Sequence, residues 1–177
     1  MIASERLFFA LWPEARLRDA LVAERAGLIE QAGTPNRPTR LSHPLDLHLT
    51  LVFIGAVNDE TLPCIGMAAD DVVLTPFTLT LDAICDWPEQ ALWLACPDAA
   101  PDALLHLVSQ LQQNLLVCGL QPEPRRYRPH VTLARKAPSV NACRLALTWQ
   151  VGDFVLAASA PGRTPSYRII RRWPLAG

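Results

Sequence analysis

A short pattern that occurs twice places the strongest constraint on how this chain can fold. His48-Leu-Thr-Leu stands in the first half of the sequence, and His130-Val-Thr-Leu stands in the second. The first copy lies in the apolar run 47–54, and the second begins directly before the run 131–134. We interpret both runs as β-strands. Because the motif recurs after nearly half the length of the chain, we expect two similar lobes that contribute one motif each.

Apolar runs and helical patterns alternate irregularly along the rest of the chain. We expect helices over about 14–32, 58–69 and 101–119, and further strands over about 6–12, 77–84, 91–95, 145–149, 154–158 and 167–173. Several of these strands follow one another directly, as in hairpins. The order of elements therefore favours an α+β fold with antiparallel or mixed sheets over a doubly wound parallel sheet.

Length and composition bound the class of protein. Half of the 177 residues are apolar, which suits one compact unit over 1–177 that contains both motifs. Glu5 and Arg6 interrupt the apolar start, so that it does not resemble a secretory signal, and no apolar run is long enough to span a bilayer. We expect a cytoplasmic protein that makes no membrane contact, and a monomer.

The cysteines predict neither a disulfide nor a metal site. Five are spread widely through the chain, at Cys64, Cys85, Cys96, Cys118 and Cys143. None forms a Cys-x-x-Cys pair, and none stands beside a histidine at the spacing of zinc ligands. We therefore expect free thiols.

Charge is distributed unevenly although the net charge is only −1. Residues 41–124 contain no lysine or arginine, whereas 125–177 carry ten basic residues against a single acid, Asp153. Fifteen of the sixteen basic residues are arginine, whose planar guanidinium suits phosphate. Two interpretations stay open: the C-terminal third forms an arginine-rich face, or folding interleaves the segments and the asymmetry disappears.

The two motifs suit chemistry on a phosphodiester. Residues two apart on a strand share a face, so His48 lies beside Thr50 and His130 beside Thr132, with the aliphatic residues between them on the opposite face. One imidazole can accept a proton while the other donates one, because imidazole titrates near neutral pH. Threonine hydroxyls can donate hydrogen bonds to the phosphate oxygens where negative charge develops.

The same alternation predicts which face of the strand the arginines near the second motif occupy. Arg128 shares the parity of His130, which makes it a candidate for binding substrate phosphate, whereas Arg135 has the opposite parity, so that a regular strand would turn it away. His43 and His106 lie outside any such motif, and we interpret both as structural or solvent-exposed.

Longer stretches around these residues resemble a known family. They are Arg6-Leu-Phe-Phe-Ala-Leu, Leu47-His-Leu-Thr-Leu-Val-Phe-Ile-Gly, Arg128-Pro-His-Val-Thr-Leu-Ala-Arg and the closing Tyr167…Trp173-Pro-Leu. In this order they are similar to the bacterial RNA 2′,3′-cyclic phosphodiesterases, first described as 2′-5′ RNA ligases, of the two-histidine phosphoesterase superfamily. The chain departs from the family pattern over 40–46 and at Val52, where many members carry a basic residue.

The resemblance implies a bilobal fold with pseudo-two-fold symmetry and a central cleft between the lobes. It implies hydrolysis of a terminal 2′,3′-cyclic phosphate to a 2′-phosphate, with a weak reverse reaction that joins RNA ends through a 2′-5′ bond. Carried over by motif, His48 is the proton donor to the leaving 3′ oxygen and His130 the base that activates water, while Thr50 and Thr132 hold the phosphate. The near-identity of the two motifs leaves the acid and base labels exchangeable.

Other functions remain open from the sequence. One is a phosphodiesterase of the same superfamily that acts on small cyclic nucleotides or 2′-5′ oligonucleotides, and another is a non-catalytic module that binds RNA ends. A metal hydrolase is disfavoured because two histidines and two threonines make a poor transition-metal site. We expect no metal, no cofactor, and RNA ends or related nucleotides as the binding partner.

Overall fold

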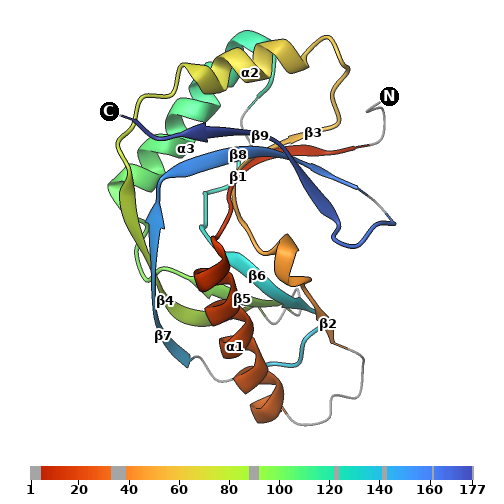
Figure 1. Cartoon of the computed structure of the whole chain (residues 1–177), viewed down its shortest axis with the longest axis vertical. Helices are drawn as coiled ribbons and strands as arrows, with labels where there is room; N and C mark the ends of the chain where they lie inside the picture. Colours follow the sequence, from red (N-terminus) through yellow and green to blue (C-terminus); the bar gives the residue numbers. More distant parts are fainter. Residues whose placement is uncertain are drawn as a thin grey trace.

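The computed structural model describes residues 5–32, 39–87, 92–121, 124–140, 143–160 and 162–176. It confirms the α+β class: helices flank a 9-stranded sheet, in which every recorded pairing is antiparallel (Figure 1). The strands are β1 Leu7–Leu11, β2 Arg40–Leu41, β3 Leu49–Gly55, β4 Phe77–Trp87, β5 Leu92–Cys96, β6 Val131–Arg135, β7 Cys143–Val151, β8 Asp153–Ser159 and β9 Tyr167–Pro174. The helices are α1 Ala15–Ala32, α2 Leu62–Asp70 and α3 Asp102–Leu115, with short 3₁₀ turns η1 Pro44–Asp46 and η3 Leu116–Cys118.

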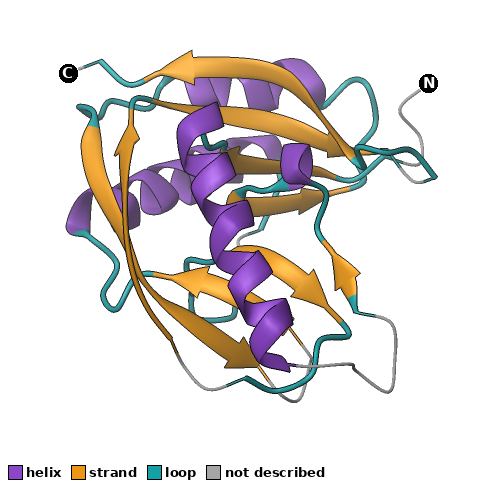
Figure 2. Ribbon diagram, turned by 60° about the horizontal axis from the view of Figure 1, so that its bottom comes forward, coloured by secondary structure: helices purple, strands orange, loops and turns teal. Residues whose placement is uncertain are grey.

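The sheet consists of two halves that meet at the motif strands. Its order is β7-β4-β5-β6-β3-β1-β8-β9, with β2 added beside β6. Between β6 and β3 the only recorded pair is Leu49 with Val131, so the halves touch through a single pairing. Helices α2 and α3 cover the half that contains β3, and α1 lies against the half that contains β6 (Figures 1 and 2). Each half thus places one motif strand at the centre of the molecule.

The aliphatic residues of the motifs anchor both strands in the core. Leu49 and Leu51 are 0% and 3% exposed, and Val131 and Leu133 are 0% exposed. Burial of four such side chains contributes roughly 1.5–3 kcal/mol each. The opposite face of each strand is therefore fixed toward the cleft, as the alternation predicts.

A β-bulge breaks this alternation on β3 directly after the motif. Thr50 pairs with Ala10, but Val52 pairs with Phe9, so that one step along β1 spans two steps along β3. The extra residue reverses the parity of Val52 and Phe53, which follow it, and a second register shift comes after Phe53. Val52 is consequently buried in the core, and Phe53 lies on the same face as Thr50 with half of its surface exposed.

The same irregularity on β6 corrects the expectation for Arg135. Thr132 pairs with Leu94, but Ala134 pairs with Trp93, so β6 also carries an extra residue after its motif. Arg135 therefore lies on the face of Thr132 and lines the cleft, where a regular strand would have turned it away. The two bulges occupy equivalent places in the two halves.

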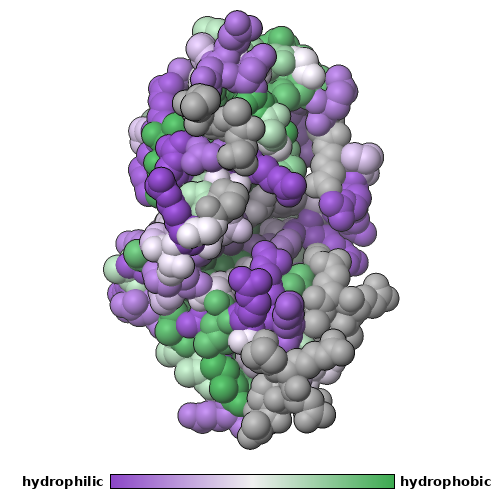
Figure 3. All heavy atoms as spheres, turned by 90° about the vertical axis from the view of Figure 1, so that its right-hand side faces the viewer, coloured by the Kyte–Doolittle hydropathy of each residue, from purple (hydrophilic) through white to green (hydrophobic). Residues whose placement is uncertain are grey.

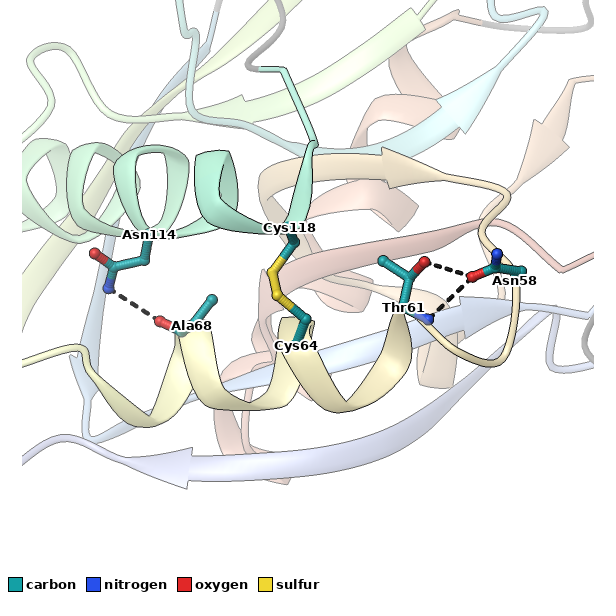
Figure 4. Close-up of a disulfide and its surroundings, with 6 residues drawn as sticks. All are labelled: Asn58, Thr61, Cys64, Ala68, Asn114 and Cys118. Carbon is teal, nitrogen blue, oxygen red and sulfur yellow. Dashed lines mark hydrogen bonds between the residues drawn. A yellow bond between two sulfur atoms is a disulfide. The ribbon is translucent and has the colours of Figure 1, made fainter.

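A disulfide contradicts the expectation of free thiols. Cys64 on α2 and Cys118 in η3 are bonded, with Cα atoms 5.8 Å apart (Figure 4). Asn114 on α3 donates a hydrogen bond to the Ala68 carbonyl at 3.0 Å in the same helix pair. Sequence spacing missed the disulfide because the packing of two helices, and not proximity along the chain, brings these cysteines together. Cys85, Cys96 and Cys143 form no disulfide, as expected.

The charge asymmetry of the sequence largely disappears on folding, which is the second of the two interpretations given above. Several basic residues of the C-terminal third form ion pairs. Arg144 pairs with Asp98, Arg168 with Glu5 and Arg171 with Asp70, all acids from earlier parts of the chain, and Arg172 pairs with Asp153 of the same segment. These pairs remove much of the predicted arginine-rich face. The cationic residues that line the cleft, Arg6 and Arg135, come from both ends of the chain.

The remaining elements agree with the expected ones to within a few residues, with two differences. Strand β4 extends to Trp87, beyond the expected end at residue 84, and the two-residue strand β2 was not expected. Within the described residues, no helix is long and apolar enough to cross a membrane.

Candidate active site

His48 sits directly before β3 in a largely aromatic surrounding. Its ring stacks on Trp12 with centroids 5.2 Å apart, and the rings of Phe8 and Tyr167 each approach to 4.9 Å. The ring Nδ1 hydrogen bonds to the carbonyl of Asp46 at 2.6 Å. Burial lowers the pKa of His48 to about 4, although the Asp46 carbonyl and carboxylate oppose the shift. In the free protein this imidazole is therefore neutral at pH 7.

His130 occupies the equivalent place before β6 and is held in the same way. Its Nδ1 hydrogen bonds to the carbonyl of Arg128 at 2.8 Å. Burial lowers the pKa of His130 below its usual value, the bond to the Arg128 carbonyl opposes this, and the charge of Arg135 lowers it further. His130 is thus also neutral near pH 7.

These bonds fix the tautomer of both rings. A carbonyl only accepts, so in each neutral ring Nδ1 carries the hydrogen and donates it. In each ring Nε2 is then the nitrogen that carries no hydrogen, and it bears the lone pair. Each ring can therefore accept a proton at Nε2, and can donate one there once it has become charged.

Both histidines line one cleft between the halves of the sheet. Its volume is about 470 Å³, and it is lined by Arg6, Phe8, His48, Thr50, Phe53, His130, Thr132, Arg135, Ser159 and Tyr167. Hydrophilic side chains gather across the waist of the face shown in Figure 3, where the surface is hollowed between the halves. The lining contains two guanidinium groups and no carboxylate, so the cleft favours an anion.

Neighbouring side chains hold the motif strands without using the threonine hydroxyls. The hydroxyl of Tyr127 donates to the carbonyl of Thr50 at 3.1 Å, and that of Ser42 donates to the carbonyl of Thr132 at 2.7 Å. Because these bonds engage backbone oxygens, the side chains of Thr50 and Thr132 remain directed to the cleft that they line. Two hydroxyls and two imidazoles thus face one cleft.

Asp46 connects His48 to the segment that follows β8. Its carboxylate is buried and accepts hydrogen bonds from the backbone N–H groups of Ser166 at 2.8 Å and Tyr167 at 3.1 Å. Its own carbonyl holds the His48 ring. One residue therefore sets the position of the imidazole and of the tyrosine ring packed against it.

The sequence model of the 2′-5′ RNA ligase superfamily matches residues 15–161. This match spans both histidine motifs and most of the chain. The chain belongs to the 2′-5′ RNA ligase superfamily.

Individual members of the superfamily are similar over the full length. The RNA 2′,3′-cyclic phosphodiesterase of Escherichia coli is 32% identical, and the alignment covers 99% of each chain. A crystal structure described as a phosphoesterase has a TM-score of 0.83 at 30% identity, with 98% of this chain and 99% of the other covered. Escherichia coli LigT in complex with 3′-AMP also gives a TM-score of 0.83, at 28% identity and 98% coverage of both chains. The expected fold is therefore confirmed.

In this superfamily member the structure brings together four of the five predicted site residues. His48, Thr50, His130 and Thr132 all line the cleft. Arg128 is exposed and is not among the lining residues, and its recorded contribution is the backbone carbonyl that holds His130. His43 caps η1 by accepting a hydrogen bond from Leu45 N, and His106 is exposed on α3, as expected for structural or surface histidines.

Sequence reasoning missed the other lining residues. Phe8, Ser159 and Tyr167 come from strands that carry no chemical motif, and Arg6 directly precedes one of them. Only the order of strands in the sheet brings these residues to the cleft that His48 lines. Arg135 and Phe53 were hidden by the bulges. Within the described ranges, no group of three or more histidine, cysteine, aspartate or glutamate side chains is arranged to hold a metal ion.

Proposed function

We propose that this protein hydrolyses RNA ends that carry a 2′,3′-cyclic phosphate, leaving a 2′-phosphate, and that His48 and His130 are its acid–base pair. The observation that carries the proposal is the convergence of both His-x-Thr motifs on one cationic cleft. Membership of the superfamily and the relatives named RNA 2′,3′-cyclic phosphodiesterase support the substrate class.

His130 acts as the base. Its neutral ring presents a lone pair at Nε2, which takes a proton from a water molecule as the water oxygen bonds to phosphorus. The phosphorus–O3′ bond breaks, and His48 delivers a proton from Nε2 to the departing O3′. The products are a 2′-phosphate and a 3′-hydroxyl. His130 then holds one proton more and His48 one fewer, and exchange with solvent restores both rings.

His48 must be charged before it can donate a proton, although it is neutral in the free protein. The negative phosphate supplies the missing stabilisation, since an anion beside an imidazole raises the pKa of that imidazole. Substrate binding therefore favours the protonated form of His48, and in the absence of substrate His48 stays neutral.

The remaining groups in the cleft act on the phosphate. Thr50 and Thr132 donate hydrogen bonds to its non-bridging oxygens, and Arg135 neutralises the charge that builds up on them. Phe53 offers an exposed ring on which the terminal base can stack. A 5′-hydroxyl of a second RNA in place of water would give a 2′-5′ linkage by the same steps.

The donor set supports a reaction that needs no metal. Two imidazoles and two hydroxyls, with no carboxylate in the lining, make a poor site for a transition metal and a poorer one for Mg²⁺. Monomeric state and a cytoplasmic location stay predictions.

The reaction class is tested with an oligoribonucleotide ending in a 2′,3′-cyclic phosphate, incubated in excess chelator. Phosphorus NMR identifies the product, and His130→Ala serves as the control. We expect a 2′-phosphate from the unmutated protein alone. Tight binding without product would instead identify a non-catalytic RNA-end module, and activity that a divalent ion must restore would identify a metal hydrolase.

The acid and base labels are tested separately with a substrate whose 3′-bridging oxygen is replaced by sulfur. A thiolate leaves without protonation, so this substrate removes the need for a general acid. We expect it to restore much of the rate of His48→Ala and little of the rate of His130→Ala. The reverse pattern would exchange the two labels.

A further inference from the structure

Two arginines face each other across neighbouring strands at the edge of the cleft. Arg40 on β2 pairs directly with Arg135 on β6. Residues directly opposite in an antiparallel pair share a face, with Cβ atoms about 4.5–5.5 Å apart, and like charges in that arrangement are destabilising. Arg135 lines the catalytic cleft, so Arg40 extends the same cationic face outward from it.

Neither guanidinium has an acidic partner in the part of the chain that the structure describes. Other arginines of the chain differ in this respect, because each forms an ion pair with a carboxylate: Arg144, Arg168, Arg171 and Arg172. Among the described residues, no carboxylate compensates the repulsion between Arg40 and Arg135. An anion between or beside them would relieve it.

The backbone holds Arg40 in this position by specific bonds. Two residues further on, Ser42 donates from its N–H to the carbonyl of Leu133 at 3.0 Å and from its hydroxyl to the carbonyl of Thr132 at 2.7 Å. The buried guanidinium of Arg25 on α1 donates to the carbonyl of Ser42. Because a buried arginine is costly unless it is hydrogen-bonded, this contact fixes β2 against β6. The two facing arginines therefore belong to an anchored strand pair.

We propose that Arg40, held beside Arg135, binds the internucleotide phosphate that precedes the terminal nucleotide of an RNA substrate. The identity of the ligand as RNA rests on the proposed function. When the cyclic phosphate lies between the histidines, the next phosphate of the strand meets the outer part of the same cationic face. Arginine suits this role because its planar fork binds two phosphate oxygens together. Arg40 thereby makes the protein prefer oligoribonucleotides over mononucleotides.

Binding of reaction products tests this without requiring turnover. The ligands are a mononucleotide 2′-phosphate and a trinucleotide ending in a 2′-phosphate, titrated against the unmutated protein and Arg40→Gln. We expect Arg40→Gln to weaken trinucleotide binding roughly ten-fold. Mononucleotide binding should stay the same, because that ligand lacks the second phosphate. The salt dependence of trinucleotide binding should decrease by about 0.7 in the log–log slope.

A neutral linkage localises the contact to one phosphate. A trinucleotide whose last internucleotide phosphate is a methylphosphonate should bind the unmutated protein as weakly as the normal trinucleotide binds Arg40→Gln. The methylphosphonate trinucleotide should bind Arg40→Gln with little further loss of affinity, since the two changes remove the same interaction. Additive losses would show that Arg40 and this phosphate do not interact, and would overturn the proposal.

Arg144→Gln is the matched control. Arg144 lies on β7, the outer strand of the same half-sheet, so this change removes the same charge far from the cleft. If Arg144→Gln and Arg40→Gln weaken trinucleotide binding equally, the effect is one of net charge and the proposal is wrong. Hydrolysis of an oligoribonucleotide that ends in a 2′,3′-cyclic phosphate is measured in parallel with the unmutated protein. Its absence would refute the proposed function, while the binding cycle would still decide the role of Arg40.

Discussion

Phe53 and Arg135 occupy equivalent positions in the two halves, each three residues after the threonine of its motif and each turned into the cleft by a β-bulge. The repeated motifs are symmetric, but these two residues are not. One half offers an aromatic face and the other a cation, so a nucleotide can bind in one orientation, with its base toward Phe53 and its phosphate toward Arg135.

Phe53→Ala should weaken the binding of nucleotides without removing the chemistry. The ring is half exposed, and stacking of a base on an aromatic side chain contributes about 1–3 kcal/mol. We expect KM for a mononucleotide 2′,3′-cyclic phosphate to rise roughly ten-fold, with kcat within a few-fold of the unmutated value. Phe53→Tyr keeps the ring and should retain most of the affinity. A large loss of kcat with unchanged KM would contradict the stacking role.

The pH dependence should differ between free protein and complex. In the free protein the pKa of His48 is about 4 and that of His130 is lowered, so kcat/KM should be greatest at acidic pH and fall as pH rises. In the complex the phosphate raises the pKa of His48, and the descending limb of kcat should move to higher pH. Initial rates at limiting and saturating substrate measure the two profiles. Superimposable profiles would contradict the activation of His48 by substrate.

The free energy of unfolding should also depend on pH through the titration of His48. The pKa of His48 is lower in the folded chain than in the unfolded chain, so the unfolded state binds more protons as the pH falls. This contribution to stability is fully present above about pH 6.5 and is lost as the pH falls toward 4. Urea unfolding at several pH values measures it, and His48→Gln should flatten the dependence over that window.

Asp46 should act as a positioning residue for His48. In Asp46→Ala the N–H groups of Ser166 and Tyr167 lose their acceptor, and Tyr167 can move away from the imidazole. We expect kcat to fall about ten-fold or more, with little change in product affinity. Asp46→Asn retains one acceptor oxygen and should restore part of kcat. Loss of affinity as large as the loss of kcat would indicate a direct contact with substrate instead.

Removing the disulfide should lower stability and leave hydrolysis intact. Cys64 and Cys118 are 54 residues apart, and the chain-entropy model gives about 4 kcal/mol for closing a loop of that size. The double variant Cys64→Ser/Cys118→Ser should show this loss in chemical unfolding, and so should the unmutated protein with reductant. Cys143→Ser is the control, because this cysteine forms no disulfide. Equal stability with and without reductant would show that the bond contributes nothing.

Strand alternation was enough to predict the centre of the site, and local irregularities hid its edges. His48, Thr50, His130 and Thr132 follow the period of two because they precede the bulges. Phe53 and Arg135 follow the bulges. No residue type in either strand predicts that a bulge inserts an extra residue there. Strand β2 is too short to show periodicity, so the pairing that brings Arg40 beside Arg135 depends on contacts between distant segments.

The most direct test of the two-histidine mechanism is the rate of cyclic phosphate hydrolysis by His48→Ala and His130→Ala in excess chelator. Each variant should fold normally and lose roughly 10²–10⁴-fold in rate relative to the unmutated protein, which should keep full activity in chelator. A rate within a few-fold of the unmutated value for either variant, or loss of the unmutated activity in chelator, would contradict the mechanism.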